Sequence, residues 1–570
     1  MDSGRNMAGY TSDKEGIYIL VELLVKKGVK RVVLSPGSRN APLIMAFARD
    51  KRIRHYVVLD ERSAAFMALG MAQQSGEAVA IACTSGTAPL NYGPAIAEAY
   101  YQRLPLIVIT ADRPQEWVDQ DDSQTIRQNG VFANIVKDSW QVPAELRGEE
   151  ERWYANRLIN EAINCALKGR RGPVHINVPL REPLYGQRIY PEETVRSVEF
   201  LESAPTLASE TWDSITERFQ ACRKVMVLAG LHLPDCRLKE SLDKLAALDQ
   251  VVVLSESPAN LGSGRHIATI DRVLATVQEE EKADLAPDLL ITFGGPLISR
   301  YVKAFLRQYK PAEHWSVDCS ECPADTFKAL TSHIHLEAAD FFSALGERVK
   351  GRESDYALRW KQKKEVAAFR HEEFARLAGW CDWKAFSLIW PAIPAGTALQ
   401  LANSTPVRYA QLFTCSRVVR VDSNRGTSGI DGSTSTAVGA SVVNAGMTLL
   451  VTGDMSFLYD SNALWNPYIP ARLKIIVMKN GGGGIFRFIP GPSGLEELEE
   501  CFEMTQKVDV EGFARLHHFR YFYASDGDTL GKVLPEFFAE TELPAILAVE
   551  TPGRENAEML RAYFGKLQHG

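Results

Sequence analysis

The chain has 570 residues, of which 45% are hydrophobic and 24% are charged, and its formal net charge at pH 7 is −7. This length predicts three or four domains of roughly 150 residues each, and the acidic balance argues against nonspecific binding to nucleic acid or to an anionic membrane. The first residues, Met1–Asn6, contain no apolar core of a signal peptide, and no uninterrupted apolar stretch is long enough to span a bilayer. We therefore expect a cytoplasmic protein with neither nucleic-acid nor membrane partners.

The first block of predicted elements covers residues 10–185. An amphipathic helix near Ile17–Lys27 comes before a short apolar strand. The strands predicted in this block lie at 31–34, 79–83, 106–110 and 174–178. Because helix-like segments separate them, the pattern predicts a parallel sheet covered by helices on both faces. A polar, proline-containing stretch at 182–205 is the first predicted linker.

Two further blocks, at 206–350 and 380–570, show the same alternation. The strands predicted in the second block lie at 225–228, 251–254, 289–293 and 315–317. Those predicted in the third lie at 398–402, 418–421, 449–452, 474–478 and 546–549. The charge-rich segment between the blocks, 351–379, predicts a solvated helix that also serves as a linker. The predicted fold class is α/β, with three Rossmann-like, doubly wound parallel sheets.

The most informative motifs follow two neighbouring strands of the third block. Gly453-Asp454-Met455-Ser456 comes after one apolar run, and Asn480-Gly481-Gly482-Gly483-Gly484 comes after the next. Both should emerge at the carboxyl edge of one parallel sheet. A carboxylate, an amide and a glycine carbonyl are hard oxygen ligands suited to Mg²⁺, so the pattern predicts a metal–diphosphate site. The alternative is an ordinary crossover connection between two parallel strands, with glycines that serve only its tight turns.

This pair of motifs resembles the GD(G)-x-NN-x-G signature of thiamine-diphosphate (ThDP) enzymes. The resemblance implies that Asp454, Asn480 and the carbonyl of Gly482 bind Mg²⁺ or Mn²⁺, and that Gly453, Met455 and Ser456 contact the cofactor. The chain departs from the signature at Met455, where glycine is usual, and at Lys479, where asparagine is usual. Neither of these positions binds the metal by its side chain.

The order of the three blocks also resembles the ThDP decarboxylase-like family. There a pyrimidine-binding domain, a central domain and a diphosphate-binding domain follow one another. The resemblance assigns these roles to residues 10–185, 206–350 and 380–570.

Glu61 stands between an apolar strand and the apolar run 64–68. The resemblance implies that this catalytic glutamate hydrogen-bonds N1′ of the ThDP pyrimidine and promotes its imino tautomer. Such a role needs a desolvated carboxyl with a raised pKa. The alternative is an exposed carboxylate at a helix start, favoured by the helix dipole.

Two long sequence segments indicate a particular family among the ThDP enzymes. SPGSRN at 35–40 and SNRGTSGIDG at 423–432, with shorter strings at 84–88, 110–114 and 126–128, closely resemble the 2-succinyl-5-enolpyruvyl-6-hydroxy-3-cyclohexene-1-carboxylate synthases of menaquinone biosynthesis. The resemblance runs from about residue 12 to about residue 555. It implies decarboxylation of 2-oxoglutarate, followed by conjugate addition of the resulting succinyl-semialdehyde carbanion to isochorismate.

Both of these substrates are dianions, which predicts a local cluster of arginines on this acidic protein. The matching arginines in strand-end loops are Arg39, Arg113, Arg127, Arg408 and Arg425, with Arg300 added from the central block. Lys303 is a candidate for a second charge beside Arg300. The other matching substrate positions are Ser38, Gln124 and Ser404. For each single arginine, a surface salt bridge is the alternative.

Four apolar residues complete the implied site. Ile430 matches the wedge that bends the cofactor, Ile485 and Phe486 match an apolar wall beside its reactive carbon, and Ile489 matches a substrate contact. A core position is an equally natural interpretation for each of them.

The resemblance further implies a homodimer or homotetramer in which Glu61 of one protomer meets Asp454 and Asn480 of another. Two other functions stay open. One is a different ThDP-dependent 2-oxo acid decarboxylase or an acetolactate-synthase-like carboligase, although one-carboxylate substrates leave the arginines unexplained. The other is a non-catalytic, diphosphate-binding regulatory protein.

Overall fold

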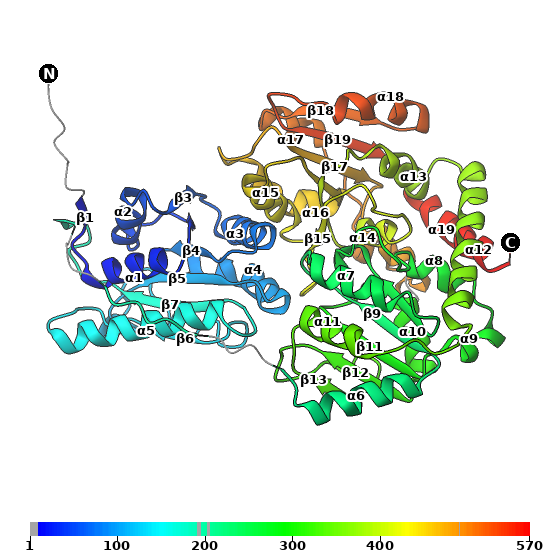
Figure 1. Cartoon of the computed structure of the whole chain (residues 1–570). Helices are drawn as coiled ribbons and strands as arrows, with labels where there is room; N and C mark the ends of the chain where they lie inside the picture. The colour runs from blue at the N-terminus through cyan, green and yellow to red at the C-terminus, as the bar shows by residue number, and fades with distance from the viewer. Residues whose placement is uncertain (1–9, 191–194, 202–205, 489–490, 570) are drawn as a thin grey trace, which may run out of the picture. The chain divides into compact units, whose positions relative to one another are not determined.

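The computed structural model describes residues 10–190, 195–201, 206–488 and 491–569. The chain forms two compact units (Figure 1). The first consists of Met1–Glu202, Gly426–Ala445 and Asp460–Ile469, and the second of Ser203–Arg425, Gly446–Tyr459 and Pro470–Gly570. Two short segments from late in the sequence therefore belong to the first unit.

The first unit is built on a six-stranded parallel sheet. In sheet order its strands are β3 (Arg54–Val57), β2 (Arg31–Leu34), β4 (Val79–Cys83), β5 (Leu106–Asp112), β7 (Val174–Pro179) and β6 (Ser139–Gln141). Its helices are α1 (Glu15–Lys26), α2 (Ala41–Arg49), α3 (Glu61–Ser75), α4 (Ala88–Gln102) and α5 (Glu149–Leu167), with the short helix η1 (Gln115–Trp117). The core on one face joins α1, α2 and α5 to the central strands, while α3 and α4 contact β4 and β5.

Helix α3 packs closely against α15 (Ser433–Val443) within this first unit. A Cβ atom on Gly70 would lie 2.0 Å from the backbone oxygen of Thr436, and one on Gly439 would lie 1.9 Å from that of Met67. Only glycine permits such an approach of two helix backbones. This contact fixes the helix whose first residue is Glu61.

A small antiparallel sheet of β1 (Tyr10–Ser12) and β8 (Gln187–Ile189) also belongs to this unit. The prediction of a plain linker over 182–205 is therefore wrong at 187–189, which form a strand. Three-residue strands carry too few apolar positions to show a period in the sequence. Residues 191–194 and 202–205 of that segment lie outside the described residues.

The second unit contains two parallel sheets. In sheet order the first has β10 (Val251–Ser255), β9 (Val225–Ala229), β11 (Leu289–Phe293), β12 (Glu313–Val317) and β13 (Ser332–Ile334). The helices around it are α6 (Ser209–Ala221), α7 (Cys236–Leu245), α8 (Ile270–Ala275), α9 (Glu279–Leu285), α10 (Arg300–Gln308) and α11 (Ala338–Arg348), with η2 (Ser257–Ala259). Separate hydrophobic clusters cover its two faces.

The other sheet of this unit has six parallel strands. In order they are β15 (Arg420–Ser423), β14 (Ala398–Leu401), β16 (Thr448–Gly453), β17 (Leu473–Lys479), β19 (Ala545–Glu550) and β18 (Arg520–Ala524). The remaining elements of the chain are α12 (Tyr356–Leu377), α13 (Asp382–Ala392), α14 (Thr405–Ala410), α16 (Asp454–Tyr459), α17 (Val510–Leu516), α18 (Gly527–Phe537), α19 (Gly553–His569), η3 (Ser461–Leu464), η4 (Gly484–Arg487), η5 (Pro492–Gly494) and the π-helix η6 (Leu498–Glu503).

The three parallel sheets confirm the predicted α/β class. Two local predictions need correction. The strand predicted at 418–421 begins at Arg420, and Val419 is 62% exposed. The charge-rich segment does form a helix, α12, but that helix is not fully solvated, since Tyr356, Trp360, Ala367 and Phe374 are buried. In the part of the chain that the structure describes, no helix is long and apolar enough to cross a membrane.

Candidate active site

Asp454 and Asn480 stand at the ends of two hydrogen-bonded parallel strands. β16 pairs with β17, and the register sets Gly453 beside Met478. Asp454 is 1% exposed, and its carboxylate accepts hydrogen bonds from the backbone amides of Met455 and Gly481, both at 2.8 Å. The two sequence motifs therefore meet at one sheet edge, where this class of sheet binds ligands.

A second buried carboxylate belongs to the same cluster. Nδ2 of Asn480 donates to Oδ2 of Asp382 at 2.9 Å. Asp382 is 1% exposed, and its other oxygen accepts a 2.5 Å bond from the Thr551 hydroxyl. Burial raises the pKa of Asp454 to about 6, the two backbone amides oppose this shift, and the charge of Asp382 adds to it.

The glycine run makes a turn that other residues do not adopt easily. Gly481 has φ +86° and Gly482 has φ +146°, and a Cβ on Gly482 would lie 2.6 Å from the backbone oxygen of Glu503. The amide of Gly484 donates to the carbonyl of Gly482 at 2.8 Å. Glycine is needed at both positions because side chains disfavour positive φ.

These residues fit a divalent cation and a diphosphate. Neither Asp454 nor Asp382 forms an ion pair with a basic side chain in the described part of the chain. Two buried carboxylates without a counter-charge are costly unless a cation joins them. The donors that the cluster offers, a carboxylate, a side-chain amide and a backbone carbonyl, are the oxygen ligands that Mg²⁺ prefers. No group of three or more His, Cys, Asp or Glu suited to a metal is found among the described residues. A Cβ added to Gly453 would meet no atom of the described residues within 4 Å, which leaves room for a ligand.

Glu61 is the first residue of α3 in the first unit. The preceding residue, Asp60, caps the helix by accepting from the Ser63 amide at 2.8 Å. Burial raises the pKa of Glu61, and the charge of Asp60 raises it further. The buried Cys83 and Tyr92 lie close enough for the charge of Glu61 to raise their pKa values as well. Glu61 is therefore not a freely solvated helix-start carboxylate.

Two of the predicted arginines line a cavity of about 710 Å³ within the second unit. Arg300, Arg408 and Ile485 all contribute to its wall. Arg300 is the first residue of α10, and Arg408 lies in helix α14, so the prediction that Arg408 sits in a loop is wrong. Nε of Arg408 is buried and has no hydrogen-bond partner among the described residues. Burial lowers the pKa of Arg408, and the charges of Arg300 and Arg425 lower it further.

Two acids that the sequence did not reveal, the half-buried Asp271 and the buried Glu256, lie beside these arginines. Asp271 lines the same cavity, and burial raises its pKa to about 6. Glu256 accepts from the backbone amides of Ile298 and Ser299, both at 2.6 Å, and burial raises its pKa to about 7. Lys303 donates to the carbonyl of Leu297 at 2.7 Å. Single acidic residues in apolar sequence carry no motif, so only the fold brings them to the arginines.

Arg39 and Arg113 lie near each other in the first unit. Arg39 is 6% exposed, donates to the carbonyl of Leu180 at 3.1 Å and pairs with Glu182 at 3.2 Å. Burial lowers its pKa, and the charge of Arg113 lowers it further. Arg113 pairs with Asp122 at 2.8 Å. The two arginines therefore form a second cluster, whose charge is offset by Glu182, Asp122 and Asp112.

The remaining predicted residues are more scattered. Arg127 has an 84% exposed side chain paired with Asp119 at 2.7 Å, and Ser38 is also exposed. Gln124 and Ser404 both have positive φ, +61° and +75°. Arg425 donates to Asn403 at 3.1 Å.

Among the apolar predictions, Ile430 is 37% exposed in the first unit. Phe486 packs edge-on against Phe502 in the second unit, with ring centroids 5.6 Å apart. In the metal motif, Met455 is half-buried and Ser456 is buried. Ile489 lies outside the described residues.

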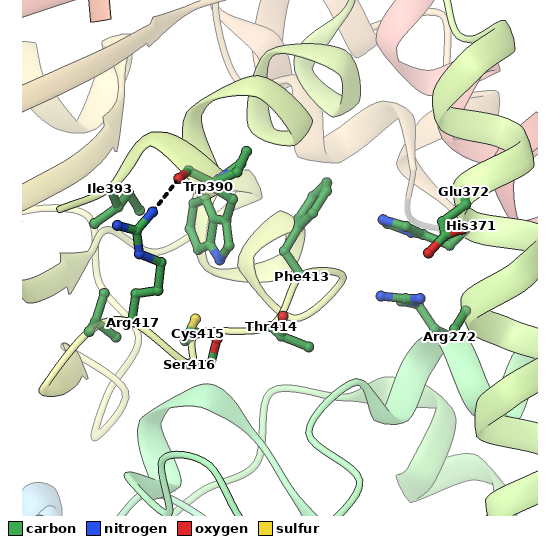
Figure 2. A pocket seen from close by; sticks show the side chains of 13 residues that line it. Arg272, His371, Glu372, Trp390, Ile393, Phe413, Thr414, Cys415, Ser416 and Arg417 are labelled. Carbon is green, nitrogen blue, oxygen red and sulfur yellow. Dashed lines mark hydrogen bonds between the residues drawn. The ribbon is translucent and has the colours of Figure 1, made fainter. Parts of the chain in front are cut away.

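Another cavity of the second unit, about 400 Å³, contains none of the predicted residues (Figure 2). It lies among Arg272, His371, Trp390, Phe413 and Arg417. Both terminal nitrogens of Arg272 donate to backbone carbonyls, at 3.2 and 3.4 Å, and Arg417 donates to the carbonyl of Pro391 at 2.8 Å. These arginines therefore hold neighbouring segments of the chain together.

Comparison with known proteins gives matches over nearly the whole chain. Residues 14–131 match the family described as thiamine pyrophosphate enzyme, N-terminal TPP binding domain. A 2-succinyl-5-enolpyruvyl-6-hydroxy-3-cyclohexene-1-carboxylate synthase of Porphyromonas gingivalis is 48% identical over 562 residues, which cover 97% of each chain. Proteins of the same name from Flavobacterium johnsoniae and Bacteroides thetaiotaomicron are 40% and 36% identical, over 96% and 98% of this chain and 98% and 99% of their own.

The parallel sheets, the strand-end cluster around Asp454 and the matched domain together define a thiamine-diphosphate-dependent enzyme. The similarity to synthases of one name, over nearly the whole chain, identifies the family within this class. This chain belongs to the family of the 2-succinyl-5-enolpyruvyl-6-hydroxy-3-cyclohexene-1-carboxylate synthases.

Proposed function

We propose that this enzyme decarboxylates 2-oxoglutarate and adds the resulting four-carbon unit to isochorismate in menaquinone biosynthesis. The observation that carries the proposal is the cavity lined by Arg300 and Arg408, which also includes Ile485 from the turn that follows Asn480. An arginine pair suits a substrate with two carboxylates, and the buried Nε of Arg408 has no hydrogen-bond partner among the residues that the structure describes.

The cofactors are ThDP and a divalent cation, Mg²⁺ or Mn²⁺. Asp454, Asn480 and the carbonyl of Gly482 would hold the cation, and Gly453, Met455 and Ser456 would contact the cofactor. When bound, ThDP supplies the electron sink for loss of CO₂ from a 2-oxo acid. The oxygen donors and the open space beside Gly453 support this assignment.

Glu61 would hold a proton against N1′ of the pyrimidine ring. A carboxyl shares its proton with a ring nitrogen best when burial raises its pKa toward that of the nitrogen, and Glu61 is shifted in this direction. Ile430 would support the bent cofactor, and Ile485, Phe486 and Ile489 would exclude water beside the reacting carbons.

The arginines would divide the substrate carboxylates between two clusters. Arg300, Arg408 and Arg425 form one, and Arg39 and Arg113 form the other. Arg127, Ser38, Gln124 and Ser404 would complete the substrate contacts.

The assembly would be a homodimer or homotetramer in the cytoplasm. Glu61 of one protomer would act with Asp454 and Asn480 of another copy. Residues 10–185, 206–350 and 380–570 would be the pyrimidine-binding, central and diphosphate-binding domains.

Substrate choice tests the proposal. The enzyme with ThDP and Mg²⁺ is given 2-oxoglutarate or pyruvate together with isochorismate, and CO₂ and the adduct are measured. We expect adduct from 2-oxoglutarate and almost none from pyruvate. A preference for pyruvate would favour an acetolactate-synthase-like carboligase and overturn the proposal.

A further inference from the structure

The side-chain amide of Asn480 has a donor end and an acceptor end of nearly the same shape, and only the oxygen end can bind a cation. In the structure, the nitrogen end donates to Oδ2 of Asp382 at 2.9 Å. An ionised carboxylate only accepts hydrogen bonds. A carboxylate at this position therefore admits one orientation of the amide and leaves Oδ1 of Asn480 directed away from Asp382.

Asp382 is itself held from several sides. Its Oδ1 accepts a 2.5 Å hydrogen bond from the hydroxyl of Thr551, the residue that follows β19. Its backbone amide donates to Oδ1 of Asn556, in α19, at 2.7 Å. It is the first residue of α13, where the helix N-terminus favours a negative charge. With an exposure of 1%, it has little freedom to turn.

The backbone on the Asn480 side is equally constrained. A Cβ on Gly553 would lie 2.3 Å from the backbone oxygen of Asn480, so the start of α19 packs directly on the end of β17. The next residue, Gly481, donates to Asp454. The contact with Gly553 and the hydrogen bond of Gly481 therefore fix the backbone on either side of the Asn480 side chain. What can still differ is whether the oxygen or the nitrogen of the Asn480 amide faces Asp382.

We propose that Asp382 is a positioning residue that presents Oδ1 of Asn480 to the divalent cation. The inference rests on the proposed function, because the cation is part of that proposal. Second-sphere partners of this kind set the orientation of the metal ligand.

The first test measures binding of Mn²⁺ to the ThDP-loaded protein from the electron paramagnetic resonance signal of free Mn²⁺. Asp382→Leu keeps the approximate shape and removes the acceptor, so we expect Mn²⁺ affinity to fall by about 10- to 100-fold. Asp382→Asn can present its oxygen to Asn480 and its nitrogen to Thr551, so its affinity should stay within about threefold.

The matched control is Asp460→Leu. Asp460 is also a buried carboxylate, but it lies in the first unit and accepts from the amide and the hydroxyl of Ser435, at 2.6 and 2.7 Å. Its loss should lower the urea midpoint without changing Mn²⁺ affinity. A comparison of the two leucine variants therefore separates general destabilisation from a specific effect on the cation.

A smaller substitution keeps the proposal testable if Asp382→Leu does not fold. Asp382→Ala removes the same hydrogen-bond acceptor without adding a bulkier apolar group, so its Mn²⁺ affinity should also fall by about tenfold or more. Asp382→Asn, which keeps an acceptor oxygen, serves as the comparison for both variants.

The outcomes are distinguishable. A folded Asp382→Leu or Asp382→Ala variant with wild-type Mn²⁺ affinity overturns the positioning role. A wild-type protein that binds no Mn²⁺ with ThDP instead overturns the metal site of the proposed function.

Discussion

The backbone amide of Gly481 donates a 2.8 Å hydrogen bond to Oδ2 of Asp454, and this one contact ties the turn after β17 to the end of β16. It requires a backbone conformation at Gly481 with φ +86°. The glycine run thus brings a backbone donor to a buried carboxylate, and the carbonyl of Gly482 follows immediately.

Gly453→Ala tests the space reserved for the cofactor. Among the residues that the structure describes, none has an atom within 4 Å of the added Cβ, so the free energy of unfolding without cofactor should change by less than about 1 kcal/mol. Affinity for ThDP should fall, because the methyl group occupies the proposed diphosphate position. Urea denaturation and a ThDP titration measure the two effects. Gly531→Ala, also into open space but within α18, is the control and should leave ThDP affinity unchanged. Unaltered ThDP binding in Gly453→Ala would move the diphosphate elsewhere.

Glu61→Gln tests the proton-holding role. The amide keeps the size of the side chain but lacks the acidic proton, so turnover should fall by about 10²- to 10⁴-fold while ThDP still binds. Steady-state rates and a ThDP titration check this. Glu116→Gln, at an exposed carboxylate of the same unit, should behave like the wild type. A fully active Glu61→Gln variant would contradict the assignment.

Arg408→Ala tests substrate recognition in the large cavity. Loss of a charged hydrogen-bond donor should raise KM for a dianionic substrate by about 10- to 100-fold, with little effect on ThDP affinity. Initial rates over a range of substrate concentrations give KM. Arg417→Ala is the matched control, because this arginine lines the other cavity and bonds a backbone carbonyl. Equal KM changes in the two variants would exclude a specific role for Arg408.

Glu256→Gln tests the pH dependence of stability. Burial raises the pKa of Glu256 from an ordinary 4.5 to about 7. Between these values the folded state keeps a proton that the unfolded chain has lost, so the free energy of unfolding falls as pH rises through this window. The shift corresponds to a loss on the order of 3 kcal/mol. Urea midpoints at pH 5 and pH 7.5 should differ less in the variant than in the wild type. Equal differences would show that Glu256 does not titrate in this range.

Much of the fold was predictable because its strands are continuous apolar runs. β4, for instance, is buried at every residue of Val79–Cys83. The predicted strand at 418–421 began too early because Val418 and Val419 look like strand residues. The actual strand starts at Arg420, whose buried ion pair with Asp422 allows two charged residues inside β15. The sequence pattern does not show that two charged residues of one strand will pair with each other and be buried.

The metal motif was predictable for a similar reason. Asp454 and Asn480 follow strands that pair in the sheet, and parallel neighbours end at one edge. Asp382 was not predictable. It precedes Asn480 by 98 residues, begins a helix with no special sequence feature, and contacts Asn480 only because the chain folds the two residues together. Side chains that act through another residue leave no local spacing to detect.

Protein stripped of cofactor by chelation and dialysis shows directly whether the reaction needs each cofactor. It receives 2-oxoglutarate and isochorismate, with ThDP and Mg²⁺ added singly or together, and isochorismate loss is followed alongside CO₂ release. We expect both substrates to be consumed only when both cofactors are present. Release of CO₂ with isochorismate untouched, or no reaction with both cofactors, would contradict the proposed function.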